Sequence, residues 1–441
     1  MGGTVIVVAA LFSGLPEWVQ VIYWIALVII VFVFAWNAVL FVLSRRALHG
    51  EAVPDPHGAD SFLWVFLVPA LNESLTIADS VSRLLAVQAR DKLVLVVDDG
   101  STDDTPAVLA GIDSPELEVV RRDPPDAGRG KAAALNAAWG RIDALLAAGR
   151  WQGWPRERII VSVVDADGRL DPHAPQHVAA HFADDRVGGL QVLVRIYNRG
   201  GPLTWCQDVE FSVYGLLYQA GRTPYGAAGM GGNGQFNRLS ALDSIADDEA
   251  GGPWRDRLTE DQDLGLRLFE AGWRSVATTG TDVQQQGPAG FRRLLRQRTR
   301  WAQGNLQAMQ HLGGMLRLER SWLVRADLVA YLLQPVLQAV VGVAFVVSIV
   351  LAIAGVASFL GDDGIQILVF FLLGYAGVFL GCIARGARRG VVGVLVGVLI
   401  VPVYAAYSWI IWPVIARATV RQLLGRREWA KTAREPIRST P

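Results

Sequence analysis

Asp165 and Asp167 are the two residues with the clearest chemical potential; they follow an apolar run and are followed by Gly168. Alternate residues of an extended strand point to the same side, so both carboxylates can face one ligand. Two carboxylates at this spacing can share a hard cation, Mg²⁺ or Mn²⁺, that also takes phosphate oxygens from a substrate. The alternative interpretation is a solvated acidic turn, because a short Asp-x-Asp occurs often by chance.

Three further acidic residues stand where a strand ends or a helix begins. Asp99 ends a predicted strand, where a carboxylate can accept hydrogen bonds from a base or a ribose. Glu260 and Asp261 follow Thr259, the predicted N-cap of a helix, and a helix N-terminus stabilises a carboxylate as the anion. An ionised carboxylate suits a general base that takes a proton from a hydroxyl. The alternatives are a turn for Asp99 and simple helix capping for Glu260.

Basic and aromatic residues that could hold a diphosphate occur at two places. The run 297–301 reads Gln-Arg-Thr-Arg-Trp, in which Arg300 can clamp diphosphate oxygens and Trp301 can stack on a sugar face. Lys131 closes the turn Gly128-Arg129-Gly130-Lys131, which can approach phosphates. A basic, aromatic membrane border is the alternative for the first run.

Short apolar runs alternate with helical patterns between residues 61 and 290. The predicted strands are 62–68, 93–97, 117–120, 159–164 and 191–196, and the predicted helices are 75–87, 105–111 and 132–146. This alternation predicts an α/β domain with a mostly parallel sheet covered on both faces, and such sheets bind ligands at the carboxyl ends of their strands. Residues 229–235 are glycine-rich and are expected to form a flexible loop that lets the backbone approach a ligand.

The remainder of the 441-residue chain is typical of a membrane protein. Hydrophobic residues make up 52% of the sequence and charged residues 19%, and the net charge of zero gives no argument for a nucleic-acid partner. Residues 18–43 carry no charge and are long enough to cross a hydrocarbon core of about 30 Å. Arg45 and Arg46 follow, so the positive-inside rule places the next domain in the cytoplasm. Cys206 and Cys382 are expected to be free thiols.

Three later apolar runs, 328–360, 365–383 and 391–413, raise a problem of topology. An acidic segment, 361–364, and a basic segment, 384–390, separate them, which predicts an external and a cytoplasmic loop. Three spans would leave the C-terminus outside, although residues 417–434 are strongly basic. Pro402 and Pro413 could break the last run into a hairpin or re-entrant segment, or one run could lie on the membrane surface.

These patterns predict five parts of the chain and a multi-pass protein of the cell membrane. They are an N-terminal transmembrane segment (1–46), a catalytic domain (47–300), an interfacial amphipathic helix (301–326), a transmembrane region (327–420) and a basic cytoplasmic tail (421–441).

The order of the motifs is more specific than any one of them. Asp-Asp-Gly-Ser at 98–101, Asp-Ala-Asp at 165–167, Thr-Glu-Asp at 259–261 and Gln-Arg-Thr-Arg-Trp at 297–301, flanked by apolar runs, resemble the membrane-integrated family 2 glycosyltransferases. That group includes cellulose, chitin, hyaluronan and poly-N-acetylglucosamine synthases and some lipid glycosyltransferases. The resemblance implies a Rossmann-like GT-A catalytic domain and an inverting, single-displacement reaction.

The resemblance also implies a role for each matching residue. It implies that Pro69, Glu73 and Asp99 bind the nucleotide of the donor and that Lys131 lines the donor pocket. It also implies that Asp165 and Asp167 bind the metal and the diphosphate, and that Asn233, Gly234 and Gln235 belong to a loop between donor and acceptor. It assigns the general base to Asp261, beside Glu260, and the clamp on the diphosphate and the acceptor border to Gln297, Arg300 and Trp301.

Two functions stay open on this basis, both with a nucleotide-sugar donor, expected to be a UDP-sugar, and Mg²⁺ or Mn²⁺. The first is synthesis of a β-linked polysaccharide, with room for an accessory export subunit, and the Gln-x-x-Arg-Trp pattern favours it. The second is transfer of a single sugar to a glycolipid without translocation. The small membrane region leaves little room for a polymer channel in a monomer. A transporter or inactive scaffold is disfavoured, because every expected carboxylate is present and no predicted span carries a charge.

Overall fold

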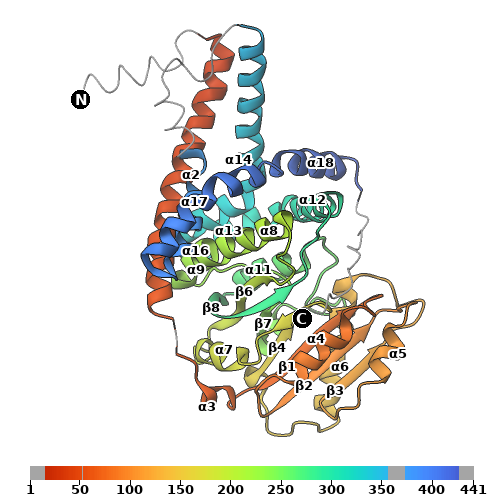
Figure 1. Ribbon diagram of the computed structural model, residues 1–441. Helices are drawn as coiled ribbons and strands as arrows, with labels where there is room; N and C mark the ends of the chain where they lie inside the picture. Colours follow the sequence, from red (N-terminus) through yellow and green to blue (C-terminus); the bar gives the residue numbers. More distant parts are fainter. Residues whose placement is uncertain (1–14, 52, 356–372, 427–441) are drawn as a thin grey trace.

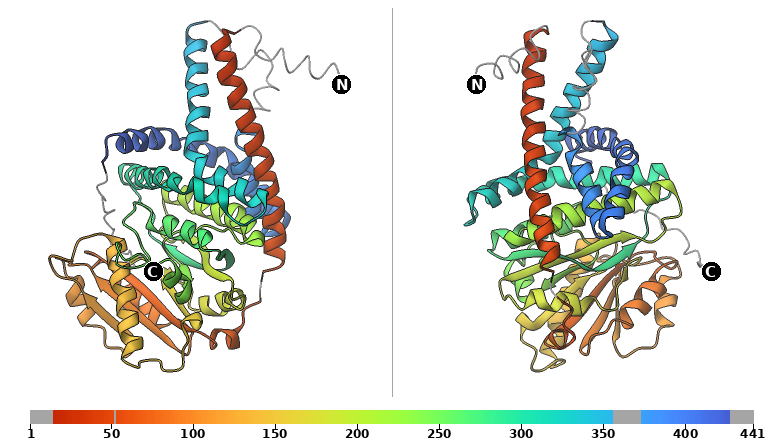
Figure 2. Two further views of the ribbon diagram at one scale, coloured as in Figure 1. Left: turned by 180° about the vertical axis from the view of Figure 1, so that it is seen from behind. Right: turned by 60° about the vertical axis from the view of Figure 1, so that its left-hand side comes forward.

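The computed structural model describes residues 15–51, 53–355 and 373–426. In these residues an eight-stranded sheet lies on one side of a layer of helices, and two long helices stand out on the other side (Figures 1 and 2). The strand order is β3-β2-β1-β4-β7-β6-β8-β5. The strands are β1 (Leu63–Ala70), β2 (Lys92–Asp98), β3 (Leu117–Arg121), β4 (Ile159–Val163), β5 (Arg169–Leu170), β6 (Val187–Ile196), β7 (Gln235–Arg238) and β8 (Arg274–Gln285).

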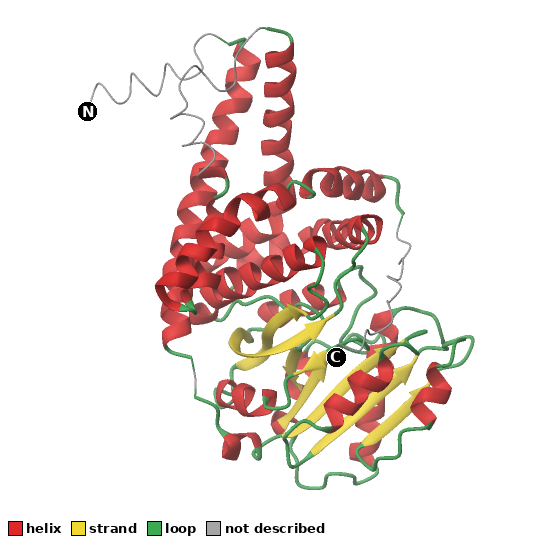
Figure 3. Cartoon of the chain, in the orientation of Figure 1, coloured by secondary structure: helices red, strands yellow, loops and turns green. Residues whose placement is uncertain are grey.

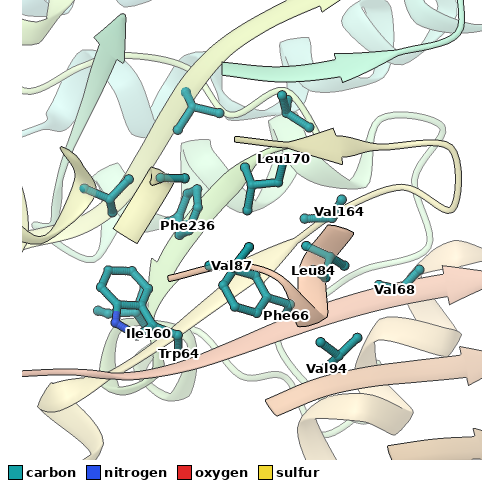
Figure 4. Packing of buried hydrophobic residues seen from close by; sticks show 14 of the residues in the cluster. Trp64, Phe66, Val68, Leu84, Val87, Val94, Ile160, Val164, Leu170 and Phe236 are labelled. Carbon is teal, nitrogen blue, oxygen red and sulfur yellow. The ribbon is translucent and has the colours of Figure 1, made fainter. Parts of the chain in front are cut away.

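The first four strands of that order are parallel and confirm the predicted α/β pattern. Side chains of β1 alternate between the two faces of the sheet. Trp64 and Phe66 enter the core under α4 (Ile77–Leu85) and α7 (Ala174–Phe182), which Figure 4 shows from close by. Leu63 and Leu67 enter a second core under α6 (Lys131–Ala147). Burial on both faces explains why these strands are almost continuously apolar.

The other half of the sheet is mixed, which corrects the prediction of a mostly parallel sheet. β7 runs antiparallel to both β4 and β6, β6 and β8 are parallel, and β5 pairs antiparallel with β8. The structure also corrects the loop expected over 229–235, because Gln235 begins β7. Neither β7 nor β8 was predicted, because polar Gln, Asn, Arg and Thr side chains interrupt the apolar pattern in both strands.

The helices of the catalytic domain include the three predicted from the alternation, the one predicted to begin after Thr259, and several that the sequence did not reveal. They are α3 (Pro56–Ala59), α4, α5 (Thr105–Ala110), α6, α7, α8 (Pro202–Val213), α9 (Ala220–Arg222), α10 (Leu239–Ser244) and α11 (Glu260–Glu270). A π-helical segment, η2 (Tyr214–Gln219), continues α8. Thr259 is the N-cap residue of α11 as predicted, but its hydroxyl makes no capping hydrogen bond.

Three described stretches are long and apolar enough to cross a membrane: Glu17–His49 (α2), Trp322–Ile353 (α14) and Gly390–Leu423. Helices α2 and α14 stand side by side away from the sheet (Figure 2), and the Tyr23 hydroxyl lies 2.6 Å from Ser348 Oγ between them. Helix α14 begins before the predicted span and contains Asp327, whose buried carboxylate pairs with Arg222 at 2.7 Å. Asp327 thus lies just before the predicted span 328–360, whose described residues carry no charge.

The third apolar stretch is not one straight span. It consists of α17 (Gly390–Ser408) and α18 (Ile411–Leu423), and α18 lies across the direction of α2 and α14 (Figure 1). The break precedes Pro413, while Pro402 lies inside α17. Gln303 of α12 donates a 2.6 Å hydrogen bond to the carbonyl of Arg426 just beyond α18. The described chain thus ends beside α12.

Helix α16 (Ala376–Ala387) and α17 form a hairpin against the catalytic domain. Their backbones approach so closely that a Cβ on Gly397 would lie 2.4 Å from the Cys382 carbonyl oxygen. Arg388 next to the hairpin turn donates to the Thr279 carbonyl at 3.2 Å, so this basic turn lies against the catalytic domain. The acidic segment 361–364, part of the run 365–383 and the tail from 427 lie outside the described residues.

The predicted interfacial helix differs in its bounds from the helices observed. The amphipathic helix α12 spans Phe291–Ala308, α13 spans Leu312–Arg317, and α14 begins at Trp322. The exposed side chain of Phe291 lies at the start of α12, and Ala302 packs on α18. In Figure 3, α12 belongs to the helical layer between the sheet and the standing helices.

Candidate active site

A cavity of about 480 Å³ runs from the carboxyl ends of β1, β2 and β4 to the apolar helices. It brings together ten predicted site residues: Pro69, Glu73, Asp99, Lys131, Asp165, Glu260, Asp261, Gln297, Arg300 and Trp301. The part lined by Glu73, Asp99 and Asp165 is called the sheet end below. The part lined by Tyr331 and Gln334 of α14, with Tyr404 of α17, is called the membrane end.

Glu73 and Asp99 stand at the sheet end because β1 and β2 are parallel neighbours whose carboxyl ends meet at one edge. The Asp99 backbone N–H donates to the Ala70 carbonyl at 2.8 Å, which fixes the turn after β2. Arg122 forms an ion pair with Asp99. Burial raises the pKa of Asp99 above its ordinary value, and Arg122 opposes that rise. Both carboxyl groups can accept hydrogen bonds from a base or ribose.

Lys131 joins three acidic residues in the centre of the cavity. Its Nζ lies 2.7 Å from Asp165 Oδ1 and 3.3 Å from Glu260 Oε1. Burial lowers the pKa of Lys131, but the two carboxylates and nearby Asp261 outweigh burial and raise it. The ammonium group therefore stays charged and is placed to attract an anionic ligand such as a diphosphate.

Asp261, at the N-terminus of α11, is the titratable group best suited to move a proton at neutral pH. Burial and the adjacent Glu260 raise its pKa to about 7, while Lys131 and Arg300 oppose the rise. Gly232 brings the backbone close to this carboxylate, because a Cβ there would lie 2.9 Å from Asp261 Oδ2. A carboxylate with a pKa near the working pH is matched to general-base catalysis.

Four predicted site residues do not line the cavity: Asp167, Asn233, Gly234 and Gln235, the last of which is buried at the start of β7. Asn233 Oδ1 accepts a 3.1 Å hydrogen bond from the Asp165 backbone N–H. Gly234 has a left-handed φ of +70°, and a Cβ there would lie 2.5 Å from Val283 Cγ1. Asp167 is buried, and its Oδ2 accepts from the Gln286 N–H at 3.1 Å. These residues hold the wall in place.

Asp165, whose carboxylate faces the cavity, could hold a hard cation only if a substrate supplies further oxygen ligands. No group of three or more His, Cys, Asp or Glu side chains placed to hold a metal occurs within residues 15–51, 53–355 and 373–426. Asp165 lines the cavity and supplies oxygen ligands, whereas Asp167 stands behind it. A Mg²⁺ or Mn²⁺ ion that keeps waters and takes phosphate oxygens needs only one or two carboxylates, so the residues fit such an ion.

Helix α12 places Gln297, Arg300 and Trp301 along one wall. Arg300 donates to the Leu258 carbonyl at 3.2 Å, which ties α12 to the residues just before Asp261. The Trp301 ring meets Phe211 edge to face with centroids 6.1 Å apart. The arrangement puts a cation and an aromatic ring between the sheet end and the membrane end.

Several residues that line the cavity beyond Asp261 carry no recognisable sequence signal. They come from α8, η2, α12, α14 and α17, and include Glu210, Phe211, Tyr214, Tyr218, Asn305, Tyr331 and Tyr404. Gln334 of α14 also lines the membrane end. Local patterns gave no signal for the others, because α8 was not predicted and the apolar helices had no assigned orientation.

A buried ionic cluster fixes the body of α11 outside the cavity. Asp263 lies 2.9 Å from Arg267 Nε and 3.0 Å from His311 Nε2, and His311 Nδ1 lies 3.1 Å from Glu270 Oε1. Burial lowers the pKa of His311, but hydrogen bonds with Asp263 and Glu270 outweigh it and raise the pKa to about 9. The cluster ties α11 to the end of α12.

A mixed α/β sheet with a carboxylate-lined cavity at its carboxyl edge defines the GT-A class of sugar transferases. Comparison with known proteins identifies the family: residues 160–383 match glycosyl transferase family group 2 and residues 65–244 match glycosyl transferase family 2. The chain belongs to this family and is a glycosyltransferase.

Two curated relatives are similar to this chain in sequence, and one solved structure shares its fold. The chain is 31% identical over 274 residues to beta-monoglucosyldiacylglycerol synthase of Synechocystis and 28% identical over 249 residues to poly-beta-1,6-N-acetyl-D-glucosamine synthase of Staphylococcus aureus, covering 60% and 55% of this chain. The matches span about half the length of these relatives, 53% and 55%. A mannosyltransferase from Pyrobaculum calidifontis, solved with GDP-Man and Mn²⁺, shares the fold at 18% identity with a TM-score of 0.58 over 92% of this chain and all of that one.

Proposed function

We propose that this chain is an inverting glycosyltransferase that moves one sugar from a nucleotide-sugar, expected to be a UDP-sugar, to a lipid-anchored acceptor at the membrane. The observation that supports this proposal is the course of the cavity. It passes from Asp99 at the sheet end, past Asp261, to Tyr331 and Tyr404 on apolar helices. An acceptor held in the membrane could reach Asp261 from that end without leaving the bilayer.

The charges of the cavity suit a donor whose leaving group is a nucleoside diphosphate. In the proposed reaction Asp261 takes the proton of the acceptor hydroxyl as that oxygen attacks the anomeric carbon from the face opposite the diphosphate. Arg300 and Lys131 stabilise the negative charge that develops on the leaving group. A cation held at Asp165 would supply Lewis-acid stabilisation of the same diphosphate when bound. One displacement inverts the anomeric centre.

The arrangement of the membrane part supports transfer to a lipid more than extrusion of a polymer. Among the described residues, only α2 and α14 extend beyond the helical layer, and the axis of α18 runs crosswise to theirs (Figure 1). The basic residues Arg45, Arg46 and Arg388 all lie toward the catalytic domain, which supports a cytoplasmic location for that domain. Polysaccharide synthesis is the second candidate, supported by Gln297-x-x-Arg300-Trp301 and by the poly-N-acetylglucosamine synthase relative, and it would call for an export partner.

A direct assay tests the proposal. Detergent-purified protein is incubated with UDP-glucose, UDP-N-acetylglucosamine or GDP-mannose and with lipid acceptors, and nucleoside diphosphate release and product mass are measured. We expect one sugar to be added to the lipid acceptor, and a ladder of polymer made without lipid would refute the lipid assignment.

The base assignment has its own variant. Asp261→Asn should lower turnover by about 10²–10⁴-fold while donor binding persists. Asp79→Asn is the matched control, because Asp79 pairs with Arg169 away from the cavity and should leave turnover near the wild-type value. Near-normal rates in Asp261→Asn would show that another group is the base.

A further inference from the structure

Glu210 of α8 is a carboxylate in the cavity wall that the proposed reaction does not use. It lines the cavity, and its side chain is 31% exposed. Its Oε2 accepts a 2.6 Å hydrogen bond from Arg298 Nη2 and a 2.7 Å hydrogen bond from the Tyr407 hydroxyl. No hydrogen-bond partner of Oε1 is found among the described residues, so one oxygen is held and the other is available to a ligand.

The position of Glu210 assigns it to the acceptor side of the cavity. Its two partners come from α12 and α17, so three helices build this part of the wall, whereas Glu73 and Asp99 at the sheet end follow strands β1 and β2. Tyr407 stacks on Tyr404, which lines the membrane end, with ring centroids 5.9 Å apart. A ligand group that reaches Glu210 therefore belongs to the acceptor.

The contacts of Arg298 make the site rigid. Its guanidinium lies 4.2 Å from the Trp301 ring centroid and 5.6 Å from that of Phe211, and it donates to Gln297 Oε1 at 2.8 Å. The same arginine thus fixes Glu210 and two residues of the Gln-x-x-Arg-Trp motif. A fixed hydrogen-bond acceptor in a partly desolvated wall discriminates well between ligands that can donate to it and ligands that cannot.

The charge of the pair indicates which chemistry it would recognise. The Arg298 guanidinium balances the Glu210 carboxylate, so the pair offers a strong hydrogen-bond acceptor with little net charge. An uncharged hydroxyl fits this site better than an ammonium or phosphate group. Since the attacking hydroxyl is assigned to Asp261, the hydroxyl that reaches Glu210 must be a second one.

We propose that Glu210 binds a second hydroxyl of the acceptor, so that the preferred acceptor is a lipid with a sugar or polyol head group and not a lipid with a single hydroxyl. This inference rests on the proposed lipid-directed transfer. The reaction that supplies such a substrate must be one that attaches a first sugar or polyol to the lipid.

The test compares two acceptors that differ in the number of their hydroxyl groups. Wild-type protein is assayed with monoglucosyl dioleoylglycerol and with dioleoylglycerol, with the donor that it turns over. We expect kcat/KM for the glycolipid to exceed that for dioleoylglycerol by about tenfold or more, because a hydrogen bond to a charged group contributes roughly a ten- to hundredfold factor. An equal or reversed preference would overturn the inference.

The variants separate binding from a purely structural role. Glu210→Ala should raise KM for the glycolipid roughly tenfold or more and Glu210→Gln less, while KM for the donor changes by less than about threefold. Glu118→Gln is the matched control, because Glu118 pairs with Arg141 and Arg150 away from the cavity. Equal changes in the KM of donor and acceptor, or no change, would show that Glu210 only holds Arg298.

Failure of the proposed function gives a different result. A wild-type enzyme that extends a soluble oligosaccharide and ignores both lipids would refute lipid-directed transfer. The same comparison of acceptor KM with donor KM then tests Glu210 on that oligosaccharide, which also carries several hydroxyls.

Discussion

The pKa of Asp261 makes a quantitative prediction about the pH dependence of turnover. A general base acts only when it is deprotonated, and burial together with Glu260 raises the pKa of Asp261 to about 7. The ionised fraction is then about one tenth at pH 6 and about nine tenths at pH 8. Activity should therefore rise with pH, roughly ninefold between these values.

The assay measures kcat/KM for the donor from pH 5.5 to 8.5, because this quantity reports the ionisation of the free enzyme. Glu260→Gln supplies the perturbation. The negative charge of Glu260 raises the pKa of Asp261. Glu260 also forms an ion pair with Lys131, and the positive charge of Lys131 lowers the pKa of Asp261. The neutral variant should move the midpoint of the profile to lower pH, so that it keeps a larger share of its own pH 8 rate at pH 6.

Glu118→Gln, which changes the same chemical group outside the cavity, should leave the midpoint in place. A flat wild-type profile between pH 5.5 and 8.5 would refute the assignment of Asp261 as a base with a raised pKa. A midpoint that moves upward in Glu260→Gln would refute the electrostatic account of that shift.

Three further predictions concern the metal, the α11 cluster and the cavity wall. EDTA should suppress nucleoside diphosphate release and added Mn²⁺ or Mg²⁺ should restore it, and EDTA-insensitive turnover would exclude a metal at Asp165. The pKa of His311, raised to about 9 from an unfolded value near 6.5, gives stability that is fully present below pH 6.5 and lost as pH rises through 9. His311→Gln should therefore lower Tm by a few degrees at pH 7, and the gap to wild type should shrink by pH 9.5; a constant gap would contradict this account. Gly234→Ala should destabilise the protein by about 1–3 kcal/mol because of its positive φ and the contact with Val283, whereas Gly251→Ala, at a similar φ of +67° but with open space around it, should cost less. Thermal unfolding of both variants measures the difference, and equal losses would mean that the contact with Val283 does not matter.

Local patterns in the sequence determined the parallel half of the sheet and most of the cavity's chemistry. The strands from β1 to β4 are buried on both faces, so their apolar runs are continuous and easy to recognise. Parallel strands bring their carboxyl ends to one edge of the sheet, which is why Asp99 and Asp165 line the same cavity although they are far apart in the sequence. Asp261 and Arg300 were found by motif order.

Only the tertiary structure decided what lies beyond Asp261. Glu210 reaches Arg298 across 88 residues and Tyr407 across 197 residues, and no local pattern encodes such contacts. For a related reason, the sequence did not predict the polar strands β7 and β8 or the break between α17 and α18. Side-chain composition shows how apolar a segment is, but packing decides which way it runs and what it touches. The sequence therefore determined the charged groups around Asp261, and the fold decided which residues line the cavity beyond them.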